Sequence, residues 1–256
     1  MTGSFLRTSL VLSALAAFAC GSPPADQPPA AAPAAGKPVD AATARTVAGK
    51  VTFTGKAPAS EMIRMSSDPA CAQSAGPSAR DNAVLVSADG ALANAFVYIK
   101  AGLDPAYTFE TPTTPVVLDQ KGCFYVPRVL GLRAGQPLEL ANTDPTFHNV
   151  HALPKENREF NSGLAPGIPP VRHIFTKPEV MVRFKCDVHG WMTAHIGVMA
   201  HPFFAVTGAD GTFSLAGVPP GTYTVEAWHE VFGTRTADVT IGAADTAPLS
   251  LVFTGE

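Results

Sequence analysis

The sequence predicts an all-β protein. Hydrophobic residues make up 46% of the 256 positions and charged residues only 15%, and the chain contains 22 Gly and 24 Pro. This balance favours many short strands joined by turns over long amphipathic helices. Several segments also alternate apolar and polar residues, which is the period of a strand with one buried face. The length accommodates one large or two small domains, so we expect β-sandwiches as the structural units.

The N-terminal residues predict export. A short positively charged segment precedes an apolar run over residues 10–19, which is too short to span a bilayer permanently. The small residues Ala17 and Ala19 fit a signal-peptide cleavage site, and the following Cys20 resembles the acylated cysteine of bacterial lipoproteins. We therefore expect residues 1–19 to be a signal peptide and Cys20 to carry a lipid, with simple secretion as the alternative.

Residues 20–45 are expected to form a flexible tether. They consist mostly of Ala, Pro, Gly and Ser and contain no aromatic residue, so they cannot bury enough apolar surface to offset the entropy of ordering. The domain is therefore expected to be exported and to lie on the periplasmic or cell-surface side of a membrane. The outer membrane is favoured because Gly21 stands where lipoproteins of the inner membrane often carry Asp.

The charge of the chain argues against a nucleic-acid partner. The formal net charge is −3, and no run of Lys and Arg stands out. A nucleic-acid-binding protein usually presents a basic patch or stripe, which is missing here. We expect no contact with DNA or RNA.

The four cysteines have different expected roles. An exported chain meets an oxidising compartment, so an unpaired cysteine needs a reason to exist. Cys20 has the lipid, and Cys71 and Cys123 both lie in turn-like contexts near the edges of predicted strands, which suits a structural disulfide. Pairing Cys71 with Cys123 leaves Cys186 free, and Cys186 has metal-binding residues nearby.

Strand periodicity predicts which side chains near Cys186 face the core. Between residues 180 and 186, one parity is apolar and ends at Cys186, so the thiol faces inward. After a turn, Met192 shares its parity with the apolar residues of a second strand, whereas His195 takes the opposite face. Cys186 and His189 can bind one ion only if the chain turns directly after the cysteine, and Gly190 permits such a tight loop.

The residue types in this loop are those of an electron-transfer copper site. A soft thiolate, imidazoles and a weak axial thioether form that donor set, and Cys186, His189 and Met192 supply three of the donors. The second imidazole must come from an earlier strand that contains His148 and His151. Strand parity does not decide between these two histidines, because each keeps phase with a different set of apolar residues.

Residues 116–198 resemble a cupredoxin, and the loop from Cys186 to Met192 is similar to that of the amicyanins, which are small blue copper proteins. Amicyanins carry a Pro-His-Asn-Val-His stretch in which the first histidine is the ligand. The resemblance therefore implies one copper ion per chain, held by His148, Cys186, His189 and Met192. It also implies that Asn149 braces the ligand loop.

This chain departs from the amicyanin pattern at two positions. Phe147 replaces the proline, and Asp187 follows the cysteine where Thr or Ser is common, which puts the usual hydrogen bond to Asn149 in question. The remaining histidines are expected to be ordinary polar residues. His151 and His195 are the exceptions, because they could form a second, peripheral metal site.

A second sandwich is expected on both sides of the cupredoxin region. Residues 208–228 alternate apolar and polar side chains between Gly- and Pro-rich turns, and they resemble the carboxypeptidase regulatory-like or transthyretin-like modules. Two upstream segments look like the opening strands of the same module. We therefore predict a Greek-key cupredoxin sandwich inserted into a second, small β-sandwich. The predicted ranges are 46–103 for the first strands of the regulatory-like sandwich, 104–200 for the cupredoxin and 201–256 for the remainder of the regulatory-like sandwich.

The expected function is one-electron transfer by a type 1 copper protein at the bacterial cell envelope. No serine elbow, paired-acid cleft or phosphate loop occurs in the second module, so we expect no enzyme. A redox partner protein is expected to dock near His189, the electron exit, with Trp191 as a hydrophobic contact. Two alternatives remain: copper storage or delivery, and a binding module with a degenerate metal site.

Overall fold

The computed structural model describes residues 36–242 and 247–255. The predicted signal peptide, the lipidation site Cys20 and most of the predicted tether lie outside these residues. No helix in the described ranges is long and apolar enough to cross a membrane. The described residues are almost entirely β structure, with one short helix, α1 (Pro69–Ala75). The prediction of an all-β protein is confirmed.

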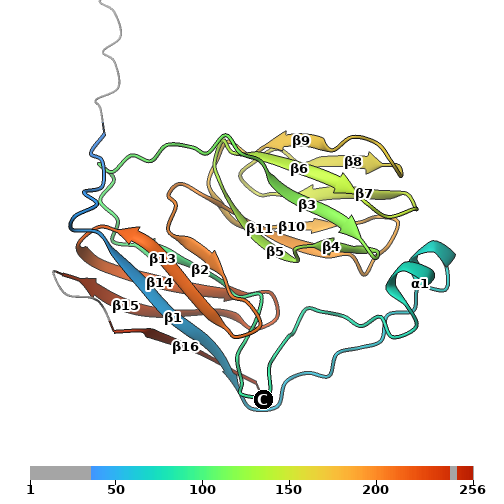
Figure 1. The fold of residues 1–256 in the computed structure, drawn as a ribbon, viewed down its shortest axis with the longest axis horizontal. Helices are drawn as coiled ribbons and strands as arrows, with labels where there is room; N and C mark the ends of the chain where they lie inside the picture. Colours follow the sequence, from blue (N-terminus) through green and yellow to red (C-terminus); the bar gives the residue numbers. More distant parts are fainter. Residues whose placement is uncertain (1–35, 243–246, 256) are drawn as a thin grey trace, which may run out of the picture. The chain divides into compact units, whose positions relative to one another are not determined.

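One sandwich combines strands from both ends of the described chain (Figure 1). Its three-stranded sheet has the order β13-β1-β16 and its four-stranded sheet the order β12-β2-β14-β15. The blue strand β1 lies between two C-terminal strands, antiparallel to β13 and parallel to β16. The strands are β1 (Arg45–Thr54), β2 (Phe96–Ala101), β12 (Phe204–Val206), β13 (Thr212–Val218), β14 (Gly221–His229), β15 (Gly233–Ile241) and β16 (Leu249–Thr254).

The other sandwich is continuous in sequence and lies between β2 and β12 of the first. Its five-stranded sheet has the order β5-β11-β10-β7-β8 and its four-stranded sheet the order β4-β3-β6-β9. The prediction of one sandwich inserted into another is therefore confirmed. The strands are β3 (Val116–Lys121), β4 (Phe124–Val126), β5 (Val129–Arg133), β6 (Pro137–Asn142), β7 (His148–Leu153), β8 (Phe160–Leu164), β9 (Val171–Ile174), β10 (Glu179–Lys185) and β11 (Thr193–Met199).

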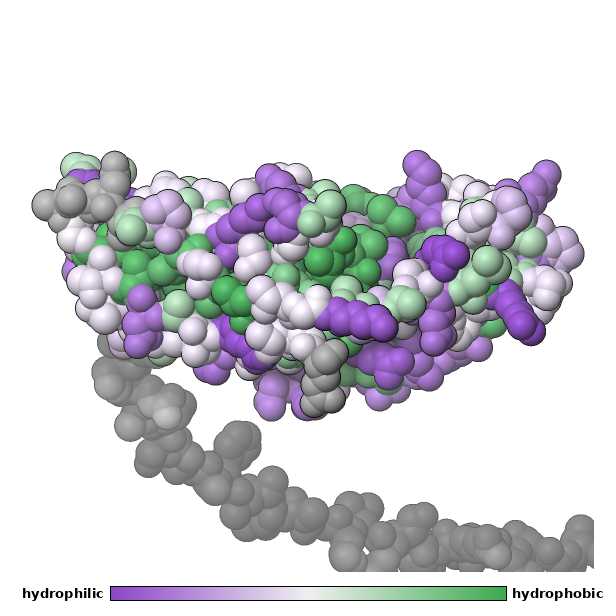
Figure 2. All heavy atoms as spheres, turned by 90° about the horizontal axis from the view of Figure 1, so that it is seen from below, coloured by the Kyte–Doolittle hydropathy of each residue, from purple (hydrophilic) through white to green (hydrophobic). Residues whose placement is uncertain are grey.

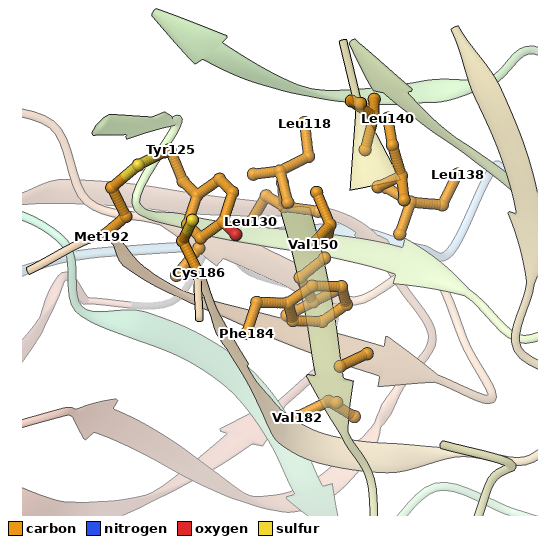
Figure 3. Close-up of a cluster of buried hydrophobic side chains, with 14 of the residues drawn as sticks. Leu118, Tyr125, Leu130, Leu138, Leu140, Val150, Val182, Phe184, Cys186 and Met192 are labelled. Carbon is orange, nitrogen blue, oxygen red and sulfur yellow. The ribbon is translucent and has the colours of Figure 1, made fainter. Parts of the chain in front are cut away.

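The core of the inserted sandwich follows from strand periodicity (Figure 3). Val182 and Phe184 of β10 are buried on the parity that leads to Cys186. Val180 shares this parity but is 42% exposed, at the point where the pairing of β10 with β11 shifts register. Met192 and the residues of its parity in β11 are also fully buried. The loop between β10 and β11 is thus fixed at both ends by strands whose inward side chains belong to one apolar cluster.

The outward face of β11 is buried as well, because it packs against the first sandwich. A Cβ placed on Gly197 would lie 2.3 Å from the Phe96 ring, so only glycine permits this close approach. Phe96, Tyr98, Val129 and Met199 form a separate small cluster there. For the same reason His195, expected on an outward face, is only 8% exposed.

The segment between β1 and β2 does not consist of sandwich strands throughout. It contains α1, and three of its side chains, Met65, Cys71 and Ala79, belong to the core cluster of the inserted sandwich. Part of the region that we assigned to the regulatory-like module therefore packs on the inserted one. On the face drawn in Figure 2, hydrophobic side chains form patches separated by polar residues.

Candidate metal centre

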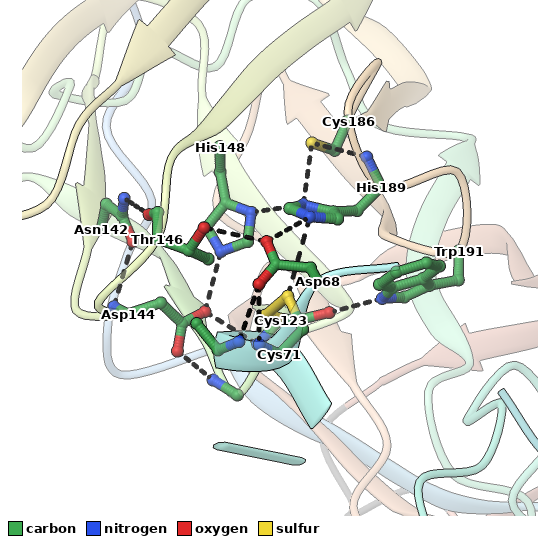
Figure 4. Close-up of a disulfide and its surroundings, with 12 residues drawn as sticks. Asp68, Cys71, Cys123, Asn142, Asp144, Thr146, His148, Cys186, His189 and Trp191 are labelled. Carbon is green, nitrogen blue, oxygen red and sulfur yellow. Dashed lines mark hydrogen bonds and ion pairs between the residues drawn. A yellow bond between two sulfur atoms is a disulfide. The ribbon is translucent and has the colours of Figure 1, made fainter. Parts of the chain in front are cut away.

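Three of the four predicted ligands meet in one buried cluster (Figure 4). The ligand atoms of His148, Cys186 and His189 all lie within 4.8 Å of one another. The two Nδ1 atoms of the histidines are 2.8 Å apart, and the Cys186 Sγ lies 3.9 Å from the Nδ1 of His189. His148 is fully buried, and Cys186 and His189 are 2% and 3% exposed. Two imidazole nitrogens and a thiol thus face one point, with little solvent around them.

The loop between β10 and β11 is closed by its own backbone. The backbone N–H of Cys186 donates to the carbonyl of Met192 (3.2 Å), and the N–H of Met192 donates to the carbonyl of His189 (2.9 Å). The N–H of His189 donates to the Cys186 sulfur at 3.4 Å. Met192 is fully buried, and Figure 3 draws its sulfur and that of Cys186 at the same end of the core, beside Tyr125.

Asn149 connects β7 to the loop between β10 and β11. Its side-chain oxygen accepts the backbone N–H of Asp187 (2.8 Å) and the thiol of Cys186 (3.2 Å). Its amide nitrogen donates to the Asp187 carboxylate at 3.1 Å. The hydrogen bond that the sequence put in question is therefore present, because the backbone of Asp187 provides it whatever the side chain.

The structure separates the two histidines that strand parity could not rank. His148, the first residue of β7, is in the cluster, whereas the ring of His151 lies at the surface between Asp187 and Glu159, 2.9 Å from each. His195 is elsewhere, with its ring 4.9 Å from that of Trp228. Among the described residues, the groups able to hold a metal include neither His151 nor His195.

Each of the two clustered histidines, His148 and His189, has a carboxylate on its far nitrogen. Asp144 Oδ2 lies 3.0 Å from the Nε2 of His148, and Asp68 Oδ2 lies 3.1 Å from the Nε2 of His189. Asp144 also accepts the backbone N–H groups of Gly122 and Cys123. Neither aspartate was predicted from the sequence to lie at this site. Asp144 precedes His148 by four residues. Asp68 is far away in sequence, and only its position shortly before Cys71 could have pointed to it.

Burial and hydrogen bonding act in opposite directions on the pKa values of the cluster. Burial opposes a charge on Cys186, but hydrogen bonds from His148 and from backbone groups outweigh it and lower the pKa of the thiol. Burial likewise disfavours a charged His148, yet Asp144 and Cys186 raise its pKa to about 9. Burial lowers the pKa of His189 despite the contact with Asp68.

The expected disulfide pair closes over this cluster. Cys71 and Cys123 are bonded, with their Cα atoms 5.5 Å apart, and join α1 to the turn between β3 and β4. Cys186 is the free cysteine among the described residues. The Cys71 sulfur lies 3.7 Å from the Nε2 of His189. The disulfide is therefore part of the wall around the ligands.

Trp191 and His189, the predicted docking contact and electron exit, are both enclosed by other residues. The indole N–H of Trp191 donates to the carbonyl of Cys123 (3.0 Å), and its ring is half-buried, 5.1 Å from that of His189. His189 is covered because Asp68 and Cys71 occupy the edge of its ring. A segment from outside the inserted sandwich thus covers the edge of His189, beside which the docking of a redox partner was predicted.

Comparisons with known proteins found one family model and several solved structures that are similar to parts of the chain. No curated protein sequence matches the chain. The chain is similar in structure to a copper-containing nitrite reductase from Thermus scotoductus (20% identity, TM-score 0.31), covering 58% of this chain and only 28% of that one. It is also similar to a purple cupredoxin from Nitrosopumilus maritimus, with 21% identity and a TM-score of 0.28, covering 33% of this chain and 98% of that one. Its similarity to amicyanin from Paracoccus versutus has 16% identity and a TM-score of 0.30, and it covers 40% of this chain and 97% of that one. Residues 194–254 match the family model of the carboxypeptidase regulatory-like domain.

Proposed function

We propose that the protein binds one copper ion at His148, Cys186 and His189, with Met192 as the weak axial donor, and carries single electrons. The observation that carries this proposal is the meeting of two imidazole nitrogens and one thiol in a buried cluster. Two imidazoles, a thiolate and a thioether suit copper, whereas zinc and the hard cations prefer other donor sets. Bound copper would supply a one-electron couple.

The residues of this chain favour electron transfer because they fix the donors before any metal arrives. The loop hydrogen bonds, the contact from Asn149 and the buried position of Met192 hold the donors between two strands. A site that is already arranged needs little movement when the charge of the ion changes. The same enclosure leaves no donor open to a substrate, which supports a carrier rather than an enzyme.

Titration of the metal-free protein with Cu(II) tests the proposal. We expect an intense visible thiolate-to-copper band that saturates at one equivalent and disappears in Cys186→Ser. His151→Ala is the matched control and should keep the band, because His151 lies at the surface, outside the cluster. Failure of the wild type to form a coloured complex would refute the copper proposal.

Storage or delivery of copper is the second candidate, and exchange with a chelator separates the two. The ligands are enclosed by Asp68, Cys71 and the disulfide, so we expect slow transfer of bound copper to an external chelator. Rapid transfer would favour delivery. We further propose that the protein is exported, is held at the membrane through Cys20 and exchanges electrons with a partner protein.

A further inference from the structure

The edge of His189 is covered by a segment from outside the inserted sandwich. Residues 68–71 begin α1, and three bonds hold this segment in place: Asp68 to the Nε2 of His189, the Thr146 hydroxyl to Asp68 Oδ2 (2.9 Å), and the disulfide from Cys71 to Cys123. Figure 4 shows Asp68 between the two histidine rings and the disulfide. We call residues 68–71 the cap.

The two oxygens of Asp68 have separate tasks. Oδ1 accepts the backbone N–H groups of Ala70 and Cys71, which is the usual role of an N-cap residue. Oδ2 is thereby turned away from the helix and toward Thr146 and His189. A residue needed only to begin α1 would not have to contact a histidine 121 residues away.

The contact fixes the ring nitrogen that faces the cluster. When the Nε2–H of His189 donates to Asp68, the Nδ1 carries the lone pair and points toward Cys186 and His148. A carboxylate on the far nitrogen of a ligand histidine also makes the ligand more basic. A more basic ligand set favours Cu(II) over Cu(I).

We propose that Asp68 is a positioning residue for His189. Asp68 sets the orientation of the His189 ring, shields the edge of that ring from solvent and lowers the reduction potential of the bound copper. This inference rests on the proposed copper site. The cap thereby forms part of the surroundings of the proposed metal site, although it belongs to a segment outside the inserted sandwich.

Two substitutions separate the tasks of Asp68. Asp68→Asn keeps an N-cap and removes the charge, and Asp68→Ser keeps an N-cap but is too short to reach His189. Glu139→Gln is the matched control, because Glu139 lies on β6 of the same sandwich and pairs at the surface with Arg172. All variants are made in the full chain.

Exchange of the His189 imidazole N–H with solvent, followed by NMR in the metal-free protein, is the first measurement. We expect exchange at least tenfold faster in Asp68→Ser than in the wild type, with no change in Glu139→Gln. Equal exchange in Asp68→Ser and wild type would overturn the shielding role. This result does not depend on copper, so it stands even if the proposed function fails.

The reduction potential and Cu(II) affinity of the loaded protein are the second measurement. Both Asp68 variants should raise the potential, and affinity should fall about 10- to 100-fold, as for other residues that contact metal ligands. Glu139→Gln should match the wild type. An unchanged potential in both Asp68 variants, with the thiolate band intact, would reduce Asp68 to a helix cap.

Discussion

Removal of the Cys71–Cys123 disulfide should destabilise the inserted sandwich strongly. The bond closes a loop of 52 residues, and the loss of chain entropy for a loop of this length corresponds to about 4 kcal/mol at 25 °C. Both residues are fully buried, so we choose Cys71→Ala with Cys123→Ala to avoid leaving buried hydroxyls. The expected result is a free energy of unfolding lower by about 4 kcal/mol.

Urea denaturation followed by Trp191 fluorescence, in a Trp228→Phe background, measures this change in the inserted sandwich. A reductant should destabilise the parent protein by a similar amount and leave the double variant unaffected. Cys186→Ala is the control for the loss of a buried sulfur without loss of a cross-link. A difference below about 1 kcal/mol between the parent and the double variant would refute the reasoning, since it would mean that the bond does not restrict the unfolded chain.

Three further predictions concern the surroundings of the site. Burial lowers the pKa of His195 to about 4, below its ordinary value of 6.5, so the free energy of unfolding should be highest above pH 6.5 and fall by about 3 kcal/mol as the pH drops to 4. Burial also lowers the pKa of His229, which adds a loss of the same sign. An equally steep loss in His195→Gln would show that His195 is not the cause. Gly197→Ala should lower the free energy of unfolding by about 1–3 kcal/mol, because the added methyl group would overlap the Phe96 ring. Gly242→Ala is the control and should leave the free energy unchanged in urea or thermal unfolding, because the space around Gly242 is open. Equal stabilities of the two variants would show that the Phe96 contact can relax. Asn149→Ala should speed the transfer of copper to a chelator about 10- to 100-fold, because Asn149 accepts the backbone N–H of Asp187. Asn161→Ala should have a smaller effect, because Asn161 contacts only the side chain of Asp187. The reverse order would assign the bracing role to Asn161.

Periodicity predicted the parts of the site that lie on regular strands. The inward direction of Cys186 and Met192 follows from alternation along β10 and β11, and the structure buries both. The insertion was predicted from resemblance, because segments on both sides of residues 104–200 look like parts of one regulatory-like module. The choice of His148 over His151 needed the resemblance, since both parities of β7 carry apolar residues.

The residues that could not be predicted belong to contacts between modules. Asp68 reaches His189 only because the disulfide carries α1 to the turn before β4, and no local pattern encodes that approach. His195 is buried by a neighbouring sandwich rather than by its own, so alternation along β11 gave the correct face but the wrong environment. Tertiary packing decided both outcomes.

The position of β1 between β13 and β16 imposes an order on folding during chain synthesis. Residues 45–54 leave the ribosome early but find their two neighbours only after residues 212–218 and 249–254 have been made. The inserted sandwich, whose strands all lie between 116 and 199, has its complete set of partners sooner. The first sandwich therefore keeps an unpaired N-terminal strand while the inserted sandwich is already able to fold. A chaperone would be needed most at this stage, before β13 and β16 have been made.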